Sequence, residues 1–329
     1  MGFLSYSLGF YRETLQTLER APVTADSLDL ARHLLRMLDD LAYEGYDELE
    51  DQLERSFRGV SRLRAYLQRN RAAAFAPPER RAGGNAVPYA SQDIDLHTAI
   101  LQAMRAADAL PEAPAPPFAD RLLRFCRWIG YDGQTAYIFL LRDMLLPFVF
   151  FLSRGRTRIH PWLLSRSSFA ALTGRPNADD ALRASVYSAL EAGCTDFRSF
   201  TAHALPDMRR TMAQHPQAER ALRAMLSEID AKRILVIESG CAGTFPLLLM
   251  SLDPRVDLRM YTTYPYLTGI LGERLFTHRY EGLLPLETMV SQERYLRFSA
   301  LRNGRFYVRR CTDAEVERRS LQEIKTIMK

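Results

Sequence analysis

The sequence predicts an α/β protein with a mostly parallel sheet, preceded by a region of helices. Apolar residues in the first part of the chain recur every three or four positions, which is typical of amphipathic helices. After residue 130, short apolar runs alternate with helical patterns, which favours parallel strands joined by crossover helices. Residues 234–237 are apolar at every position, as in a strand that is buried on both faces.

Length and composition indicate a globular protein with two regions. The chain has 329 residues, of which 47% are hydrophobic and 25% charged, enough for a full core. We expect a helical acceptor-side or lid region over 1–125 and an α/β domain over 126–329. The sequence shows neither an apolar run of membrane-spanning length nor a signal-peptide pattern, and its four cysteines are scattered. These features predict a cytoplasmic location.

The first part of the chain reads as helices throughout. Leu28, Ala31, Leu35 and Leu38 form an apolar stripe, and further helices are expected over 95–107 and 118–129. No alternating run appears before residue 125, so no sheet is expected there. Acidic residues gather between 39 and 54, either as a solvated helix face or as a surface for a cationic partner. Residues 71–90 break the pattern and are expected to form a linker or an active-site loop.

The second part of the chain alternates between strand and helix patterns. Asn303-Gly304 predicts a hairpin turn, and Thr312 begins a capping-box pattern before a last helix. Strands are expected at 137–141, 159–164, 234–237, 258–263, 295–298 and 306–308. Helices are expected at 144–152, 179–192, 217–229 and 245–252.

A glycine loop follows the most apolar strand. It reads Glu-Ser-Gly-Cys-Ala-Gly-Thr over 238–244, and its glycines permit positive φ and close approach of a ligand. Thr244 is expected to cap the next helix, whose N-terminal amides would bind an anion. The loop therefore predicts a phosphorylated ligand, with an ordinary strand-to-helix turn as the alternative. It is not a Walker A motif, because no Lys-Ser/Thr pair follows the second glycine.

Polar residues follow three successive predicted strands. Arg142-Asp143 comes after the first, Ser165-Arg166 after the second and the glycine loop after the third. Ligands in open α/β sheets bind beyond the carboxyl ends of the strands. Two arginines and an amide-rich loop can hold a polyphosphate, and an acid can orient ribose hydroxyls or a magnesium-bound water.

These residues resemble the type I phosphoribosyltransferases. In that family, four apolar residues, an acidic pair and a Thr-Gly-x-Thr-like loop open a helix. Residues 234–237 and Glu238 match the strand and the first acid, and Ala242-Gly243-Thr244 resembles the end of the loop. The resemblance implies a phosphoribosyltransferase-like sheet in which Glu238 contacts the ribose hydroxyls. The loop amides and Thr244 would hold the 5′-phosphate, and Arg142-Asp143 with Arg166 would hold the diphosphate.

The implied activity is transfer of a phosphoribosyl group from phosphoribosyl diphosphate, carrying Mg²⁺, to a small acceptor in a biosynthetic pathway. The acidic cluster makes a cationic acceptor, such as an aminosugar or aminocyclitol, one expectation. Arg142, Asp143, Arg166 and Glu238 are the expected catalytic residues. The expected substrate-binding residues are Ser165, Ser239, Gly240, Cys241, Ala242, Gly243 and Thr244. Ser239 stands where the family has its second acid, and the loop is about one residue short, so a non-catalytic nucleotide sensor of the same fold is an alternative.

A second, weaker resemblance is to hydrolase-like proteins of bacterial polysaccharide clusters. These proteins have a strand that ends in Arg-Asp-Gly, then a strand with Ser-Arg, then a loop Asp-x-Gly-x-x-Gly-Ser/Thr. Residues 141–143, 164–166 and 238–244 match these three motifs in the same order. A haloacid-dehalogenase-like sugar phosphatase would need an Asp-x-Asp pair after an apolar strand. Asp93-Ile94-Asp95 is the candidate, and a helix N-cap is the preferred interpretation.

Other site classes have less support in the sequence. The six histidines show no metal-ligand spacing, so no protein-held metal is expected. The net charge is +5, but basic and aromatic residues do not interleave as in nucleic-acid-binding modules. The expected partners are small-molecule substrates, with neither nucleic acid nor a membrane among them.

Overall fold

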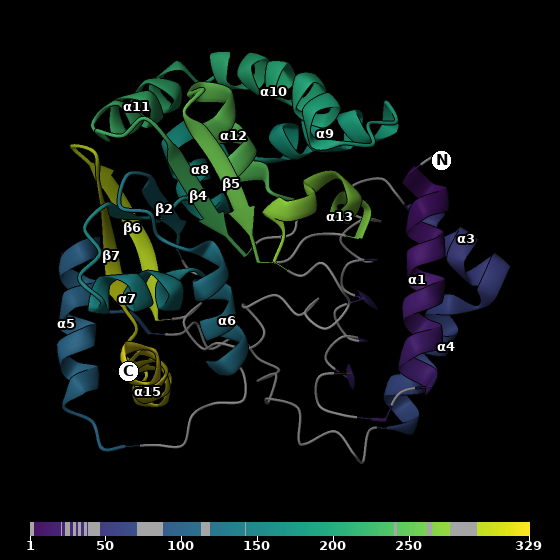
Figure 1. Ribbon diagram of the computed structural model, residues 1–329, viewed down its shortest axis with the longest axis horizontal. Helices are drawn as coiled ribbons and strands as arrows, with labels where there is room; N and C mark the ends of the chain where they lie inside the picture. Colours follow the sequence, from purple (N-terminus) through teal and green to yellow (C-terminus); the bar gives the residue numbers. More distant parts are fainter. Residues whose placement is uncertain are drawn as a thin grey trace.

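Two sheets and the helices around them make up most of the part of the chain that can be described (Figure 1). The computed structural model describes residues 3–20, 22–23, 27–28, 31, 34–35, 38, 47–70, 88–112, 119–141, 143–239, 242–261, 265–276 and 295–329. The predicted α/β class is confirmed, because one of the two sheets is entirely parallel.

The parallel sheet has the order β3-β2-β4-β5. Its strands are β2 (Ala136–Leu140), β3 (Ile159–Trp162), β4 (Ile234–Glu238) and β5 (Val256–Met260). As predicted, 234–237 lies in an interior strand and is buried throughout, with β2 and β5 on either side. Continuous apolar residues suit this position because both faces of the strand are covered by helices.

Helices cover the two faces of this sheet. From β2 the chain passes to β3 on one side, whereas from β4 it passes to β5 on the other. Crossover connections are right-handed, so these opposite directions place α7 and α12 on opposite faces. Helix α7 (Leu145–Ser153) packs with α6 (Ala119–Ile129), and α12 (Thr244–Leu252) packs with α9, α10 and α11. Helices α9, α10 and α11 span Asp180–Glu191, Phe197–Ala213 and Pro216–Ser227. Helix α8 (Arg166–Thr173) follows β3.

The second sheet joins two distant parts of the chain. Its antiparallel order is β1-β7-β6, with β1 (Ile94–Asp95), β6 (Leu296–Arg302) and β7 (Arg305–Arg310). Asn303 and Gly304 form the predicted turn with φ of 50° and 71°. Helix α5 (Leu96–Asp108) packs against β7 and α15 (Ala314–Met328), and α15 packs in turn against α7. This part of the structure is called the C-terminal layer below: β1, α5, β6, β7 and α15.

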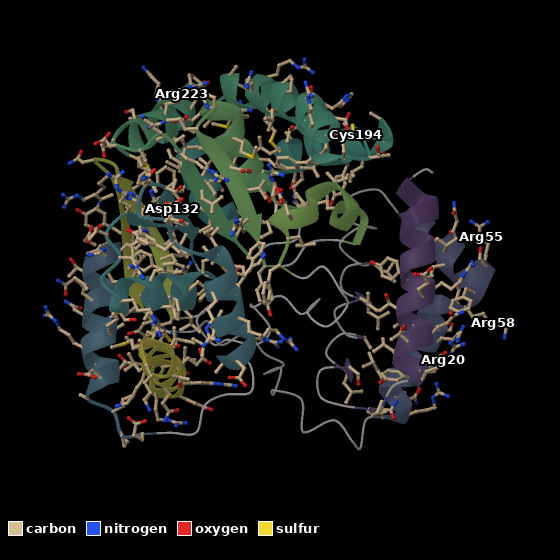
Figure 2. All side chains as sticks on the ribbon, in the orientation of Figure 1. Arg20, Arg55, Arg58, Asp132, Cys194 and Arg223 are labelled. Atoms are coloured by element: carbon tan, nitrogen blue, oxygen red, sulfur yellow. The ribbon has the colours of Figure 1, made fainter. Side chains whose placement is uncertain are left out.

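The most N-terminal helices lie beside α13 (Pro265–Leu271), which precedes a short turn of 3-10 helix, η2 (Gly272–Arg274). Helix α1 (Phe3–Arg20) packs against α3 (Asp47–Phe57) and α4 (Gly59–Arg69) and also contacts α13. Leu28, Ala31 and Leu38 are helical and buried, as their spacing predicts. Arg55 and Arg58 point away from the sheets (Figure 2). Residues 71–87 of the loop predicted at 71–90, and much of the acidic cluster, lie outside the described residues.

Several expectations from the sequence are wrong in detail. The first 125 residues do contribute a strand, β1, and α5 packs into the C-terminal layer instead of forming a separate lid. Helices α8 and α10 were not predicted. The last helix is capped by Asp313, whose carboxylate accepts from the amides of Glu315 and Val316, and not by Thr312. The division at residue 125 stays a prediction.

Candidate functional site

The carboxyl edge of the parallel sheet collects the N-termini of three helices. Helix α7 begins shortly after β2, α8 after β3 and α12 after β4. The Phe169 and Phe245 rings, near the starts of α8 and α12, meet with centroids 5.8 Å apart. Helix N-termini carry unpaired amides and a partial positive charge. This edge is therefore a favourable environment for an anion.

The structure brings Asp143 and Ser239 together at this edge. Ser239 Oγ donates a hydrogen bond to Asp143 Oδ2 at 3.0 Å, although the residues are 96 positions apart. Ser239 is fully buried, whereas Asp143 is half-buried. The pair lies between β2 and β4, where the direction of strand order reverses. Ligands of open α/β sheets bind at such a switch point.

The end of the glycine loop begins α12 as a tight turn. Ala242 and Thr244 are buried, and Gly243 has a φ of 64°, in the left-handed region that favours glycine. Gly243 occupies the N-cap position, so the expectation that Thr244 caps the helix is wrong. A Cβ at Gly243 would lie 3.0 Å from Met260 Sδ. The glycine therefore serves packing against β5 as well as the turn.

Ser165 and Arg166 lie at the carboxyl end of β3. Ser165 caps α8: its side chain accepts from the Ser168 amide, and its own amide donates to Ser168 Oγ at 2.7 Å. Arg166 is exposed and pairs with Asp179, Nε to Oδ2 3.4 Å. Asp179 is buried and also faces Arg183 at 3.6 Å. The sequence marks Asp179 only as the start of a predicted helix, and the loop before it carries no signal of this pairing.

Glu238 ends β4 at the same edge and is half-buried. Its backbone carbonyl accepts from the amide of Tyr261, which follows β5. Glu238, Asp143 and Ser239 thus come from the ends of adjacent strands, and a shared site there stays a prediction. Arg142, Gly240 and Cys241 lie outside the described residues.

Asp93 comes directly before β1 and Asp95 ends it, so both lie at the antiparallel sheet and not at the carboxyl edge of the parallel one. Asp95 caps α5 by accepting from the Thr98 amide, in agreement with the preferred interpretation. Asp93 accepts from Ser299 Oγ at 2.6 Å and pairs with Arg302 and Arg309 at 2.9 Å each. The Ser299 and Arg309 hydrogen bonds hold the pKa of Asp93 below its usual value.

The structure also reveals polar residues that the sequence analysis did not select. Asp132, Arg233 and Arg259 line a pocket at the opposite, amino edge of the parallel sheet. The available signal was Arg259, a charged residue inside the predicted strand 258–263. Among the described residues, no cluster of three or more histidine, cysteine, aspartate or glutamate side chains has metal-binding geometry.

Comparison with known proteins gave no match to a family model, a curated protein or a solved structure. None of the described helices has both the length and the apolar character needed to cross a membrane.

Proposed function

We propose that the protein binds a phosphorylated small molecule at the carboxyl edge between β2 and β4 and transfers a phosphoribosyl group from phosphoribosyl diphosphate to a small acceptor. The observation that carries the proposal is the contact of Asp143 with Ser239 at the switch point, beside the start of α12. The resemblance of 234–244 to the type I phosphoribosyltransferases supports the choice of donor, and with it a phosphoribosyltransferase-like sheet.

The chemistry of this proposal needs charge stabilisation at two places. When diphosphate leaves, negative charge grows on its oxygens and positive charge grows on the ribose carbon. The cations Arg142 and Arg166 would stabilise the leaving diphosphate, and Glu238 would hold the ribose hydroxyls. Arg166 is exposed, and its contact with the buried Asp179 is long, at 3.4 Å. Asp179 keeps Arg183 as a second partner, so Arg166 can exchange this contact for a phosphate oxygen.

Mg²⁺ would arrive with the diphosphate as part of the substrate. Mg²⁺ commonly binds through one or two carboxylates plus substrate phosphates, and the half-buried Asp143 offers such an oxygen at this edge. The amides at the start of α12 would face the 5′-phosphate.

The proposal is tested by diphosphate release from phosphoribosyl diphosphate, with magnesium and a panel of amino-bearing and neutral acceptors. Asp143→Asn keeps an oxygen that accepts from Ser239 but removes the charge, and we expect release to fall by about a hundredfold. Asp120→Asn is the control, because Asp120 is an exposed carboxylate on α6. Release that is unchanged in Asp143→Asn would contradict the role of this edge.

A second candidate is a protein of the same fold that senses a nucleotide without catalysis. The observation that favours it is Ser239, which stands in place of a second acid and is fully buried. Calorimetry separates the two functions: binding of phosphoribosyl diphosphate without release under any acceptor supports the sensor. The phosphatase alternative predicts phosphate release from sugar phosphates that Asp93→Asn abolishes, although Asp93 is held by Ser299 and two arginines.

A further inference from the structure

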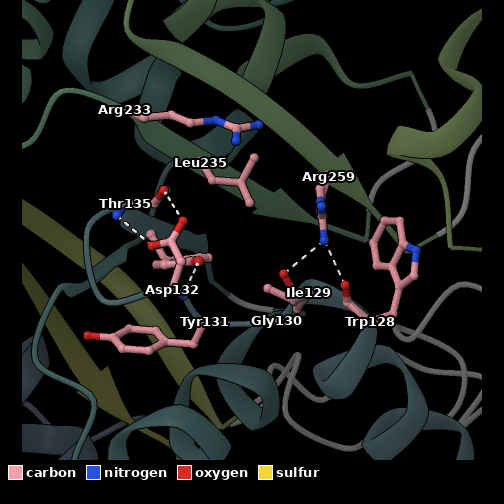
Figure 3. Close-up of a pocket in the computed structure, with 10 residues that line it drawn as sticks. Trp128, Ile129, Gly130, Tyr131, Asp132, Thr135, Arg233, Leu235 and Arg259 are labelled. Atoms are coloured by element: carbon pink, nitrogen blue, oxygen red, sulfur yellow. Dashed lines mark hydrogen bonds between the residues drawn. The ribbon is translucent and has the colours of Figure 1, made fainter.

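A concave site lies near the amino edge of the parallel sheet. It is a pocket of about 290 Å³ below the starts of β2 and β4, bounded by the loop that joins α6 to β2. Figure 3 shows the guanidinium groups of Arg233 and Arg259 on the strand side and the loop residues opposite. Arg259 itself lies beside Ile237 in β5, and its side chain reaches the end of α6. None of the pocket residues is one of the site residues predicted from the sequence.

Arg259 is held in one orientation. Its Nη1 donates to the carbonyls of Trp128 at 2.6 Å and Ile129 at 2.8 Å, at the end of α6. Its guanidinium also lies over the Trp128 ring, 4.9 Å from the centroid. Both hydrogen bonds use one of the three guanidinium nitrogens. A guanidinium fixed in this way loses little entropy when it binds a ligand.

Arg233 supplies a second, more accessible guanidinium. Its side chain is 56% exposed, and Nη2 lies 3.2 Å from Asp257 Oδ2. Asp257 has another partner, because Arg274 Nε lies 2.9 Å from Oδ1. The pair is weak on the arginine side, because the Arg233 guanidinium is largely exposed to water. Arg233 can therefore turn to a ligand while Arg274 keeps Asp257 neutralised.

The carboxylate in the pocket is directed into its own loop. Asp132 accepts from the amides of Gln134 at 2.9 Å and Thr135 at 2.7 Å, and from Thr135 Oγ1 at 2.7 Å. These bonds hold the pKa of Asp132 below its usual value, so it is ionised and already solvated by the loop. A ligand that enters the pocket therefore meets two guanidinium groups whose charge this carboxylate offsets only in part.

We propose that this pocket binds a small dianion: a phosphate ion or the phosphate group of a small phosphomonoester. The two guanidinium groups that line the pocket match the oxygens of a phosphate, which arginine binds in bidentate fashion. The rings near the pocket already have partners, since Trp128 stacks with Phe125 and Tyr131 with Tyr137. The ligand therefore needs no aromatic part.

The position of Trp128 provides a local probe. The chain has two tryptophans, and Trp162→Phe leaves Trp128 as the only one. We expect inorganic phosphate and glycerol phosphate, titrated separately into this variant, each to change the Trp128 emission in a saturable way. Tighter binding of the ester would identify a phosphomonoester as the ligand, and equal affinities would identify free phosphate. Either affinity should fall as salt is raised.

The matched variants separate a site from general charge attraction. Arg233→Gln, made in the Trp162→Phe background, is expected to weaken binding by about tenfold or more, and Arg233→Lys by less. Arg127→Gln removes the same charge from an exposed position on α6 that does not line the pocket, and should leave binding unchanged. The proposal is overturned if millimolar phosphate leaves the emission unchanged, if Arg233→Gln has no effect, or if Arg127→Gln weakens binding equally. Asp143→Asn acts at the other edge, so its effect on diphosphate release is independent of this result.

Discussion

At the scale of single residues, the hydrogen bond from Ser239 to Asp143 links the ends of β2 and β4. Ser239→Ala removes the donor and leaves the Asp143 carboxylate less well satisfied. We expect the free energy of unfolding to fall by about 1–3 kcal/mol, the usual cost at a partly buried charged group. Urea denaturation of the variant and the wild type measures this difference in the free energy of unfolding. Ser227→Ala is the control, because the exposed Ser227 hydroxyl donates only within its own helix, and a loss of the same size there would contradict this account.

Gly243 shows how one residue sets the geometry of the loop. The sequence alone predicts that Gly243→Val blocks ligand binding with a modest loss of stability. The positive φ and the 3.0 Å approach of a Cβ to Met260 Sδ change this expectation. Gly243→Val should lower the free energy of unfolding by about 2 kcal/mol or more.

The matched control for this change is Gly174→Val. Gly174 has a φ of 67°, and no atom lies within 4 Å of the position that a Cβ would take there, so this variant carries the backbone strain alone. Thermal unfolding of both proteins isolates the contact with Met260. Equal losses in the two variants would show that this contact contributes nothing.

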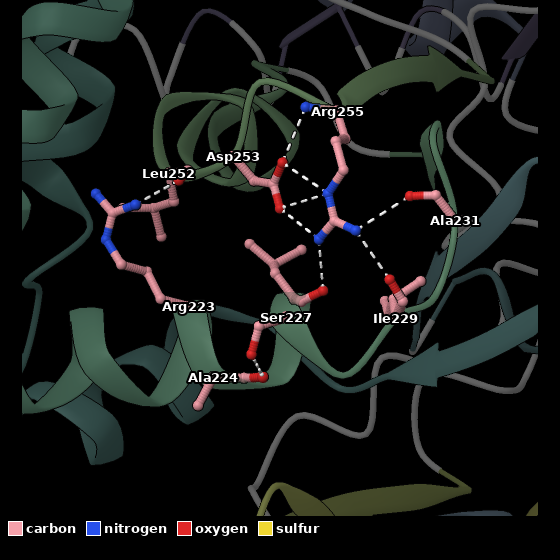
Figure 4. A network of polar contacts seen from close by, with 9 residues as sticks. Arg223, Ala224, Ser227, Ile229, Ala231, Leu252, Asp253 and Arg255 are labelled. Atoms are coloured by element: carbon pink, nitrogen blue, oxygen red, sulfur yellow. Dashed lines mark hydrogen bonds and ion pairs between the residues drawn. The ribbon is translucent and has the colours of Figure 1, made fainter.

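At the scale of elements, Arg255 joins the connection before β4 to the connection before β5. Its guanidinium donates to the carbonyls of Leu226, Ile229 and Ala231 and pairs with Asp253 at 2.7 Å (Figure 4). Arg255→Met keeps an unbranched side chain but removes every side-chain hydrogen-bond donor at this position. We expect a loss of about 2 kcal/mol or more in urea denaturation. Arg220→Met should have little effect, since the exposed Arg220 donates to a carbonyl of its own helix.

The same contact predicts a pH dependence. The hydrogen bond from Arg255 holds the pKa of Asp253 below its ordinary value of 3.8. A carboxylate with a lowered pKa in the folded state stabilises the protein at pH values above its ordinary pKa. This stabilisation is lost as the pH falls through the folded-state pKa. Asp253→Asn should therefore be less stable than the wild type at neutral pH, with the difference narrowing below about pH 3.8. A constant difference across the acid range would contradict this role.

An element could be predicted from the sequence when its burial leaves a local pattern of apolar residues. Strand β4 was found because both faces are covered and every position is apolar, and α7 was found for a similar reason. Helix α10 was missed because it contains Pro206 and many polar residues, and packing against α9 and α12 outweighs that weak local signal. Strand β1 has two residues and depends on pairing with β7, which no local pattern reveals.

The candidate site was predictable only in part, for the same physical reason. Strand ends can be read from the sequence, so the approach of Asp143 to Ser239 follows from their positions after β2 and β4. The pairing of Arg166 with Asp179 depends on the course of the chain between α8 and α9. The pocket near the amino edge depends on the side chain of Arg259, which reaches α6. Neither contact has a local signature.

At the scale of the whole molecule, α15 connects the two sheets by packing against α5, α6 and α7. Ile324 is fully buried there. Ile324→Ala should lower the free energy of unfolding by about 2–5 kcal/mol, the cost of a cavity in a core. Because α15 contacts helices of both sheets, we expect tryptophan emission and far-UV circular dichroism to shift together in one transition. Arg318→Ala, at an exposed position of α15, is the control; separate transitions for the two signals would show that the layers unfold independently.

The pairing of β1 with β7 also bears on the order in which a growing chain can fold. Asp93 and Arg309 are 216 residues apart in the sequence, yet they form an ion pair. During synthesis the strands of the parallel sheet emerge well before β7, whereas the apolar side of α5, with Leu96, Ala99 and Ile100, must wait for β7 and α15. Domains fold as their parts emerge from the ribosome, and contacts over long separations form slowly. We therefore expect α5 to keep an uncovered apolar stripe during this interval, and the nascent chain to aggregate most readily then.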